Sequence, residues 1–384
     1  MSTVAPTATR QEYYASQLAS WYPTFSKPRI GRTKGVTLKS VVICNNDSAD
    51  HEQTTTMIIP PNFGSAFLAA PHGVRLPTGV QPSSCLGFTG GGDPDDDDSD
   101  DDDDDDSVPP HTAPPLPKLD LTALTQHIDA AIQQLGGRVV AKTNWSAPRD
   151  AVWINEGTLQ CQTAGDVYLL LQASDFCQSD VQLLAALQEQ PPECETGTTS
   201  PPLSLHIVLR KWCQLHASHE FRCFVRQHRL VALTQRHTDQ YFDHIVQDRD
   251  DLLFMVQEFF TEVVQHQYAD GAIPNYVMDV YIDRQDRVWI VDFNIWGDRT
   301  DALLFEWDEL NEWPGDKETE FRMIETAKEI LPQALHNYRA PVDTVYLAGL
   351  TGGNPDKFQA FMDLCQQPSA MAGQDDSSSD DENA

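Results

Sequence analysis

Basic residues are scarce in this sequence: 26 Lys and Arg stand against 58 Asp and Glu, which gives a formal net charge of −32. No stretch rich in lysine or arginine is present to neutralise phosphates, so we expect no direct binding to nucleic acid or to an anionic membrane surface. Twelve aspartates lie between Asp93 and Asp106, and five further acids lie between Asp375 and Glu382. The charge pattern therefore favours a basic partner.

Signals of secretion, membrane insertion and zinc binding are also missing. The eight cysteines include no C-x-x-C pair and no zinc-ligand spacing. The first residues, MSTVAPTATRQEYY, form no charged-then-apolar signal, and no run of 18 apolar residues occurs. The glycine fingerprints of P-loop and Rossmann sites are absent as well. We expect a cytoplasmic, monomeric protein with reduced thiols.

Apolar content is sufficient for a real core, with 40% hydrophobic residues, eight Trp and sixteen Phe. Shifts in composition predict five segments along the chain. They are an N-terminal segment packed on the core (1–44), a disordered acidic insertion (45–117), a smaller lobe (118–202), a larger lobe (203–350) and a C-terminal segment with an acidic disordered tail (351–384). The insertion is rich in Pro, Gly, Ser and Asp, so it cannot bury enough apolar surface to offset its ordering entropy.

Hydrophobic periodicity predicts mixed secondary structure. Helices are expected over 119–137, after a cap at Thr163, and over 250–268, and the Pro/Gly/Thr-rich stretch 178–202 is expected to be a loop between the lobes. Strands are expected at 36–44, 139–142, 203–212, 220–226, 230–236, 276–283 and 288–294. This mixture predicts an α+β fold with largely antiparallel sheets.

The segments YVMDVYID and VWIVDFN, separated by RQDR, have the pattern of a β-hairpin. Symmetric pairing places residue i opposite residue 571 − i, so Asp279 faces Asp292, and alternation puts Asn294 on the same face. Two directly opposed carboxylates repel unless a cation lies between them. Because magnesium prefers oxygen ligands and keeps positions for water and phosphate, the three residues are candidate magnesium ligands.

The alternative is that both carboxylates lie on a solvated face and pair with Arg284 or Arg299. Three apolar residues expected on the same face, Val277, Val288 and Ile290, argue instead for partial burial.

Other segments contain candidate phosphate and adenine contacts. In EFRCFVR, Glu220 and Arg222 project from one face, where the arginine could bind phosphate and the glutamate a ribose hydroxyl, or the two could form a structural ion pair. The strand HIVLRKW suits an adenine slot, although a tryptophan in the position of Trp212 is more often a core residue. Lys142 ends a strand before a turn and could reach phosphate, or could be an ordinary exposed lysine.

Several of these motifs occur together in a known order. KTNWSAPRDAVWI, DVYLLLQASDF, VLRKWCQL, EFRCFVR, TQR with QYFDH, and MDVYIDRQDRVWIVDFN resemble the cell-division-cycle protein 123 (D123) family. The likeness extends from WYPTF and VTLKSVVI to WGDRTDALLFEW. The chain departs from the family pattern at Thr143, where KLNW is usual, at His237, where QRD is usual, and at Ile295, where DFNP is usual.

The resemblance implies a two-lobed ATP-grasp fold that binds ATP and magnesium. It implies a role as assembly chaperone for eukaryotic translation initiation factor 2, acting through the gamma subunit. Carried over by motif, the nucleotide-binding residues are Lys142, Asn144, Trp145, Ala147, Arg210, Lys211, Trp212, Cys213, Glu220, Arg222, Asp279, Asp292 and Asn294. The last three are the implied magnesium ligands, in agreement with the hairpin argument.

Two other functions remain open from the sequence. An ATP-grasp ligase would use the same site to activate a carboxylate substrate as an acyl phosphate. An acidic binding module would use its polyaspartate run to contact basic proteins, with the lobes serving only as structure. No catalytic residue is predicted, and whether the protein is an enzyme stays open.

Overall fold

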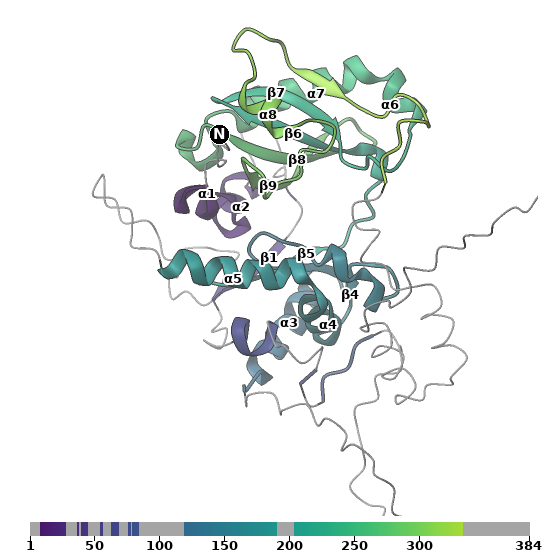
Figure 1. Cartoon of the computed structure of the whole chain (residues 1–384). Helices are drawn as coiled ribbons and strands as arrows, with labels where there is room; N and C mark the ends of the chain where they lie inside the picture. The colour runs from purple at the N-terminus through teal and green to yellow at the C-terminus, as the bar shows by residue number, and fades with distance from the viewer. Residues whose placement is uncertain are drawn as a thin grey trace, which may run out of the picture. The chain divides into compact units, whose positions relative to one another are not determined.

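Two five-stranded β-sheets organise the chain (Figure 1). The computed structural model describes residues 8–27, 37, 40–44, 54–56, 63–68, 76–77, 79–83, 119–189 and 203–332. All of them belong to one unit, formed by Met1–Ser84 and Pro110–Arg339. The polyaspartate run and the predicted C-terminal segment 351–384 lie outside the described residues.

The smaller sheet has the strand order β2-β1-β5-β3-β4. Its strands are β1 (Ser40–Cys44), β2 (Thr54–Thr56), β3 (Val139–Lys142), β4 (Gln160–Cys161) and β5 (His206–Lys211). β1 and β2 pair in parallel, and the other neighbours pair antiparallel. The central strand β5 has the apolar residues Ile207, Val208 and Leu209 in succession and is buried from His206 to Arg210, as expected for a strand covered on both sides.

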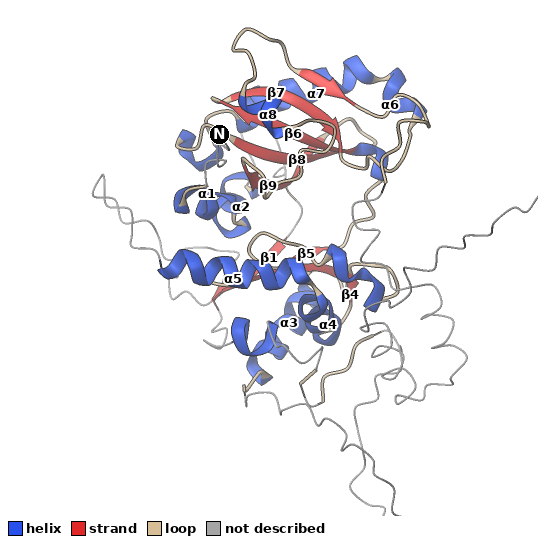
Figure 2. Cartoon of the chain, viewed as in Figure 1, coloured by secondary structure: helices blue, strands red, loops and turns tan. Residues whose placement is uncertain are grey.

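Helices pack against this smaller sheet (Figure 2). α3 (Thr122–Gln134) and α4 (Ala164–Ala173) contact its strands, and α5 (Asp175–Glu189) and the short helices η1 (Phe63–Leu68) and η2 (Arg149–Ile154) pack on α4 and on one another. α3 buries Leu124, Ile128 and Ile132, which recur at helical spacing. α4 begins at the predicted cap, because the Thr163 hydroxyl accepts from the backbone N–H of Asp166 and the Asp166 carboxylate accepts from that of Thr163.

The larger sheet has the strand order β10-β7-β6-β8-β9. Its strands are β6 (Glu220–Arg226), β7 (Arg229–Gln235), β8 (Tyr276–Ile282), β9 (Val288–Ile295) and β10 (Glu320–Arg322), and only the β10–β7 pair is parallel. The helices of this part are α1 (Arg10–Ser16), α2 (Leu18–Ser26), α6 (Asp243–Gln247), α7 (Arg249–Phe259) and α8 (Trp307–Asn311), with the short helices η3 (Ala217–His219), η4 (Phe260–Val264) and η5 (Tyr268–Gly271).

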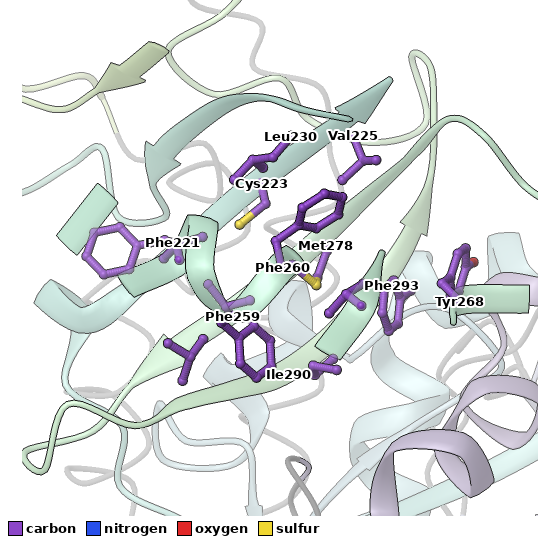
Figure 3. Close-up of a cluster of buried hydrophobic side chains, with 14 of the residues drawn as sticks. Phe221, Cys223, Val225, Leu230, Phe259, Phe260, Tyr268, Met278, Ile290 and Phe293 are labelled. Carbon is purple, nitrogen blue, oxygen red and sulfur yellow. The ribbon is translucent and has the colours of Figure 1, made fainter. Parts of the chain in front are cut away.

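One face of the larger sheet carries its main hydrophobic core (Figure 3). Phe293 of β9 stacks on Tyr268 with ring centroids 4.2 Å apart, and Trp21 of α2 meets Phe293 edge-on at 5.2 Å. The helical N-terminal residues therefore pack on the same side of β9 as η5. The opposite face of β6 and β8 carries a second apolar cluster, which includes Phe224 and Val277, and beside it polar side chains such as Arg222 and Asp279.

The predicted loop over 178–202 is wrong at 178–189, because α5 continues to Glu189, and the rest of it lies outside the described residues. The segment DVQLLAALQE places Leu184 and Leu187 at helical spacing, and both are buried together with Cys177 and Asp180. The Pro, Gly and Thr residues that suggested a loop begin only at 191, outside the described residues. Averaging composition over the whole stretch hid the amphipathic part.

Part of the predicted insertion 45–117 contributes to the core of the smaller sheet. Phe63 and Phe67 of η1 stack with ring centroids 5.0 Å apart, and Phe67 meets Tyr168 of α4 edge-on at 5.1 Å. Further along, Ser83 donates to the Asp166 carboxylate through its backbone N–H and its hydroxyl. Sequence analysis missed this short, mostly apolar segment, FGSAFL, because the polar residues around it dominate the composition of 45–117.

The predicted α+β class with largely antiparallel sheets is confirmed. Among the helices of the described residues, none is long and apolar enough to cross a membrane.

Candidate functional site

The β8–β9 hairpin brings Asp279 opposite Asp292, as the sequence predicts. The route to this register differs from the predicted one. Ile282 pairs with Val288 across a five-residue turn, so near the turn residue i lies opposite 570 − i. A β-bulge then leaves Val291 without a partner, and beyond it the pairing becomes 571 − i. The bulge therefore brings Asp292, and not Val291, opposite Asp279.

The bulge also corrects one expectation about burial. Val288 and Ile290 do not share the face of the carboxylates, because they join the core that contains Phe293. The extra residue at Val291 inverts the alternation of side chains along β9. Val277 does lie on the carboxylate face, in a separate cluster with Phe224.

Arg222 of β6 neutralises Asp279 directly. Nε and Nη2 of Arg222 each donate to one carboxylate oxygen of Asp279 at 2.8 Å, and Nη1 donates to the Asp301 carbonyl at 2.7 Å. Burial alone would raise the pKa of Asp279, but Arg222 and then Arg236 outweigh it and hold the pKa at about 2. Asn294 donates its amide to the same carboxylate at 3.3 Å. Asp279 is therefore ionised and oriented.

Asp292 is neutralised from the smaller sheet. The Lys142 ammonium, at the end of β3, donates to Asp292 Oδ2 in a short ion pair, and the lysine is only 4% exposed. Arg210 of β5 donates Nη1 to the carbonyl of Val291, the bulged residue. These two contacts join the smaller and larger sheets around the hairpin, so the predicted residues Lys142, Arg210 and Asp292 are brought together.

The two carboxylates thus pair with cations of the chain, and the alternative pairing with Arg284 or Arg299 is wrong. Arg284 contacts the His216 ring, and Arg299 lies 3.6 Å from Asp180. The argument from carboxylate repulsion is incomplete for the same reason. In the structure Arg222 and Lys142 already relieve that repulsion.

Other predicted contact residues serve the scaffold through their side chains. The Asn144 amide donates to the Ser204 carbonyl and accepts from the His206 backbone N–H. The Trp145 indole donates to the Tyr13 carbonyl and packs edge-on against that ring. Ala147 lies at the same turn, and its carbonyl accepts from the Arg149 N–H. Of the remaining predicted residues, Trp212 and Cys213 are half-buried and Lys211 is exposed.

The turn after Lys142 is held by Asp180, a fully buried carboxylate of α5 that sequence reasoning missed. Its oxygens accept from the hydroxyls of Thr143 and Ser146 and from the backbone N–H groups of Trp145 and Ser146. Arg299 approaches the same carboxylate. The departure from the family pattern at Thr143 therefore supplies a hydrogen bond that leucine could not make. No local pattern could reveal a partner on a distant helix.

Glu220 lies at the edge of the cluster. Its carboxylate contacts the His237 ring at 3.4 Å, and its carbonyl accepts from the Arg236 N–H. The second departure from the family pattern, His237, thus contacts a predicted site residue. The third, Ile295, is buried in a cluster with Tyr13 and Leu184.

The chemistry of the donor set fits a magnesium-bound polyphosphate. Among the described residues no three His, Cys, Asp or Glu side chains gather as a metal site. Two carboxylates and one amide are too few ligands for magnesium by themselves. They can hold the ion if phosphate and water oxygens occupy the other coordination positions, which is how magnesium is commonly bound in proteins. Arg210 is buried, and its Nε and Nη2 have no hydrogen-bond partner among the described residues. An anion would satisfy them.

The site carries an excess of positive charge. Four cations lie with three carboxylates in the described part: Lys142, Arg210, Arg222 and Arg236 with Glu220, Asp279 and Asp292. Arg149 and Asp301 add one charge of each sign through longer-range electrostatic interactions. A magnesium-bound triphosphate carries a net negative charge, so the set is complementary to such a ligand.

His206, which supports the Asn144 turn, gives a pH prediction. Burial lowers its pKa from 6.5 to about 4. The unfolded chain takes up a proton near pH 6.5 and the folded chain cannot until near pH 4, so the free energy of unfolding falls as the pH drops through this interval. The loss should reach about 3 kcal/mol at pH 4 and be absent above pH 6.5.

The measurement is urea unfolding at pH 7 and pH 5 for the unmodified chain and for His206→Gln. The variant should lose roughly 2 kcal/mol less on acidification, whereas His127→Gln, a change on the exposed side of α3, should behave like the unmodified chain. An equal acid loss in all three proteins would contradict the assignment to His206.

Together, the fold and site define a two-lobed α+β protein whose lobes share a cation-rich, carboxylate-containing centre. The D123 family profile matches residues 50–348, and the chain belongs to the D123 family. The Translation initiation factor eIF2 assembly protein of Xenopus laevis is 37% identical over 265 residues, covering 66% of this chain and 73% of that protein. Cell division cycle protein 123 of Phaeosphaeria nodorum is 42% identical over 196 residues, covering 50% and 49%.

A solved structure also supports membership in this family. Cdc123 from Schizosaccharomyces pombe matches with a TM-score of 0.55 and 28% sequence identity, over 83% of this chain and 99% of that chain. The two-lobed α+β fold expected from the family resemblance is therefore confirmed.

Proposed function

We propose that this chain binds ATP with magnesium at the centre formed by Asp279, Asp292 and Asn294. The observation that carries the proposal is the surplus of buried cations around the carboxylates of Asp279 and Asp292, including Arg210 with two unsatisfied nitrogens. Asp279, Asp292 and Asn294 would hold magnesium, which would supply positive charge to offset that of the two carboxylates and of the phosphates. Lys142 and Arg222 would then be free to bind phosphate.

The other predicted residues complete the proposed site. The backbone of the turn from Asn144 to Ala147 would approach the phosphates. The strand end from Arg210 to Cys213 would line the adenine with its backbone, and the Arg210 side chain would face the phosphates. Glu220 would accept from a ribose hydroxyl. In this arrangement the side chains of Asn144 and Trp145 hold the turn in place and do not touch the nucleotide.

We further propose that the bound nucleotide serves assembly of eukaryotic translation initiation factor 2, through its gamma subunit, and not a ligase reaction. Support comes from the relatives in Xenopus and other organisms that are named as assembly proteins for this factor. Binding energy can hold two lobes in one arrangement without chemistry. Nucleotide binding with little turnover is the expected signature, whereas a ligase would release phosphate when given an acid and an acceptor.

The test combines titration calorimetry with capture of the purified gamma subunit. We expect magnesium-ATP to bind the unmodified chain and to increase capture. Lys142→Ala and Asp292→Ala should reduce both. Undiminished capture by both variants would separate partner binding from the nucleotide, and steady phosphate release with a small acid plus acceptor would favour the ligase.

A further inference from the structure

Asp180 of α5 is the acceptor around which the turn after Lys142 is formed. Its carboxylate is fully buried, and one oxygen accepts from the Thr143 hydroxyl at 2.5 Å and from the backbone N–H groups of Trp145 and Ser146 at 3.2 and 2.8 Å. The Ser146 hydroxyl donates to the other oxygen at 2.9 Å. One carboxylate therefore sets the direction of two backbone N–H groups, in a segment that the proposed function assigns to the phosphates.

The cation that pairs with this carboxylate in the described part of the chain belongs to the larger lobe. Arg299 lies in the loop after β9, with Nη2 3.6 Å from Asp180 Oδ1. Two hydrogen bonds fix this loop, because Thr300 donates its backbone N–H to the Gly297 carbonyl at 2.9 Å and its hydroxyl to the Ile295 carbonyl at 2.7 Å. Although the Arg299 side chain is 43% exposed, its backbone is therefore held in place.

A second contact joins the same turn to the larger lobe. The Trp145 indole donates to the Tyr13 carbonyl at 3.0 Å, and the two rings meet edge-on with centroids 5.7 Å apart. Tyr13 belongs to α1, which packs on β9, and it is buried in one cluster with Ile295 and Leu184. The turn is thus contacted from the side of the larger lobe both through Asp180 and through Trp145.

The environment of Asp180 makes the contact with Arg299 important for the turn. Burial raises the pKa of Asp180, although the hydrogen bonds from Thr143, Trp145 and Ser146 act in the opposite direction. The ionised carboxylate is therefore not fully compensated within the smaller lobe. A buried charge is stabilised by a nearby opposite charge, and here that charge comes from the other lobe.

We propose that Arg299 is a positioning residue, which acts through Asp180 to keep the turn 143–146 in the shape that receives the phosphates when the two lobes are in this arrangement. In this role Arg299 does not contact the nucleotide. The inference rests on the proposed function and adds to it a coupling between the arrangement of the lobes and the backbone that faces the phosphates. Thr143, a departure from the family pattern, supplies a further donor to the same carboxylate.

Two competing explanations make different predictions. If Arg299 forms only an ordinary exposed ion pair, its loss changes neither the turn nor nucleotide binding. If Arg299 binds phosphate directly, its loss weakens nucleotide binding whether or not Asp180 is charged. Measuring the turn itself, and combining substitutions at the two positions, separates these explanations from the positioning role.

The first measurement is hydrogen exchange of the full chain without nucleotide, followed by mass spectrometry of peptides that cover 143–147. We expect Arg299→Met to speed exchange in these peptides roughly fivefold to tenfold, an effect between those of an exposed and a fully buried ion pair. Arg299→Lys keeps the charge and should restore most of the protection. The matched control is Arg284→Met, because Arg284 is an exposed arginine of the same lobe that contacts the His216 ring.

The second measurement is titration calorimetry with magnesium-ATP. Arg299→Met should weaken binding roughly fivefold to tenfold, and Asp180→Asn should weaken it at least as much. In the Asp180→Asn background Arg299→Met should have no further effect, because the two side chains act as one unit. If Asp180→Asn does not fold, Thr143→Leu takes its place, since it also removes a contact of this carboxylate, and the two losses should again be non-additive.

Unchanged exchange at the turn in Arg299→Met, an equal effect of Arg284→Met, or faster exchange spread over the whole chain would overturn the positioning role. So would an equal weakening of ATP binding by Arg299→Met with and without the Asp180 carboxylate, since Arg299 would then act directly. If the unmodified chain does not bind ATP, the proposed function fails, whereas the exchange measurement still decides whether Arg299 holds the turn.

Discussion

Replacing Arg222 with methionine is expected to lower the free energy of unfolding by about 3–5 kcal/mol, the range found when one partner of a buried ion pair is removed. Arg222 is 4% exposed, makes both hydrogen bonds to Asp279 and also binds the Asp301 carbonyl. Methionine fills much of the volume but leaves the carboxylate uncompensated. Arg236, at 3.6 Å, recovers only part of the interaction.

Urea unfolding at neutral pH measures this effect. The matched control is Arg287→Met, because Arg287 pairs with Asp283 at the exposed turn of the same hairpin and is 56% exposed. Only the Asp283 partner of this pair is partly shielded, at 15% exposure, and its carboxylate also accepts from the Trp289 indole and from backbone N–H groups. The loss should therefore be about 1 kcal/mol, well below that of Arg222→Met. If both variants lose a similar amount of unfolding free energy, the Arg222–Asp279 pair stabilises the fold no more than the pair at the turn does.

Asp292→Asn is expected to weaken magnesium-ATP binding by at least about 100-fold, since even residues one step removed from a metal change its affinity about 10–100-fold. The change keeps the size of the side chain and removes the charge that faces Asp279 and the Lys142 ammonium. It also releases Lys142, so the nucleotide alone should lose less affinity than its magnesium complex. Titration with and without magnesium measures both quantities.

Asp286→Asn is the control for this second prediction. Asp286 lies in the turn of the same hairpin with φ of 55°, a conformation that asparagine tolerates well, and it is exposed. The same loss of one charge there should leave affinity within about twofold. If Asp292→Asn retains tight, magnesium-dependent binding, the carboxylate pair is not the metal site.

The sequence was sufficient to predict secondary structure where the signal spans only a few residues. The alternating strands of the larger sheet, the cap at Thr163 and the helix stripe of α3 all form as predicted, because hydrophobic periodicity and capping act over a few residues. Pattern failed for α5 and η1, where polar or Pro-rich neighbours outweighed a short amphipathic segment.

The facing of Asp279 and Asp292 shows how a correct prediction can rest on an incomplete argument. The expected register assumed a symmetric turn, but the turn holds five residues, and the bulge at Val291 restores the pairing. The same bulge presents a carbonyl to Arg210 and moves Ile290 to the core face. A one-residue insertion in a strand leaves no clear mark in the sequence, because its position depends on tertiary packing.

The sequence by itself determined the fold class, the family and the hairpin that holds the candidate metal ligands, since these depend on periodicity and on motifs that lie close together in the chain. Only the tertiary structure decided which charges meet. Lys142 and Asp292 are 150 residues apart in the sequence, and Asp180 of α5 accepts hydrogen bonds from the turn that follows Lys142. Electrostatic partners are set by distance in space, and Arg222 and Arg236 meet at Asp279 only when β6, β7 and β8 are brought together by folding.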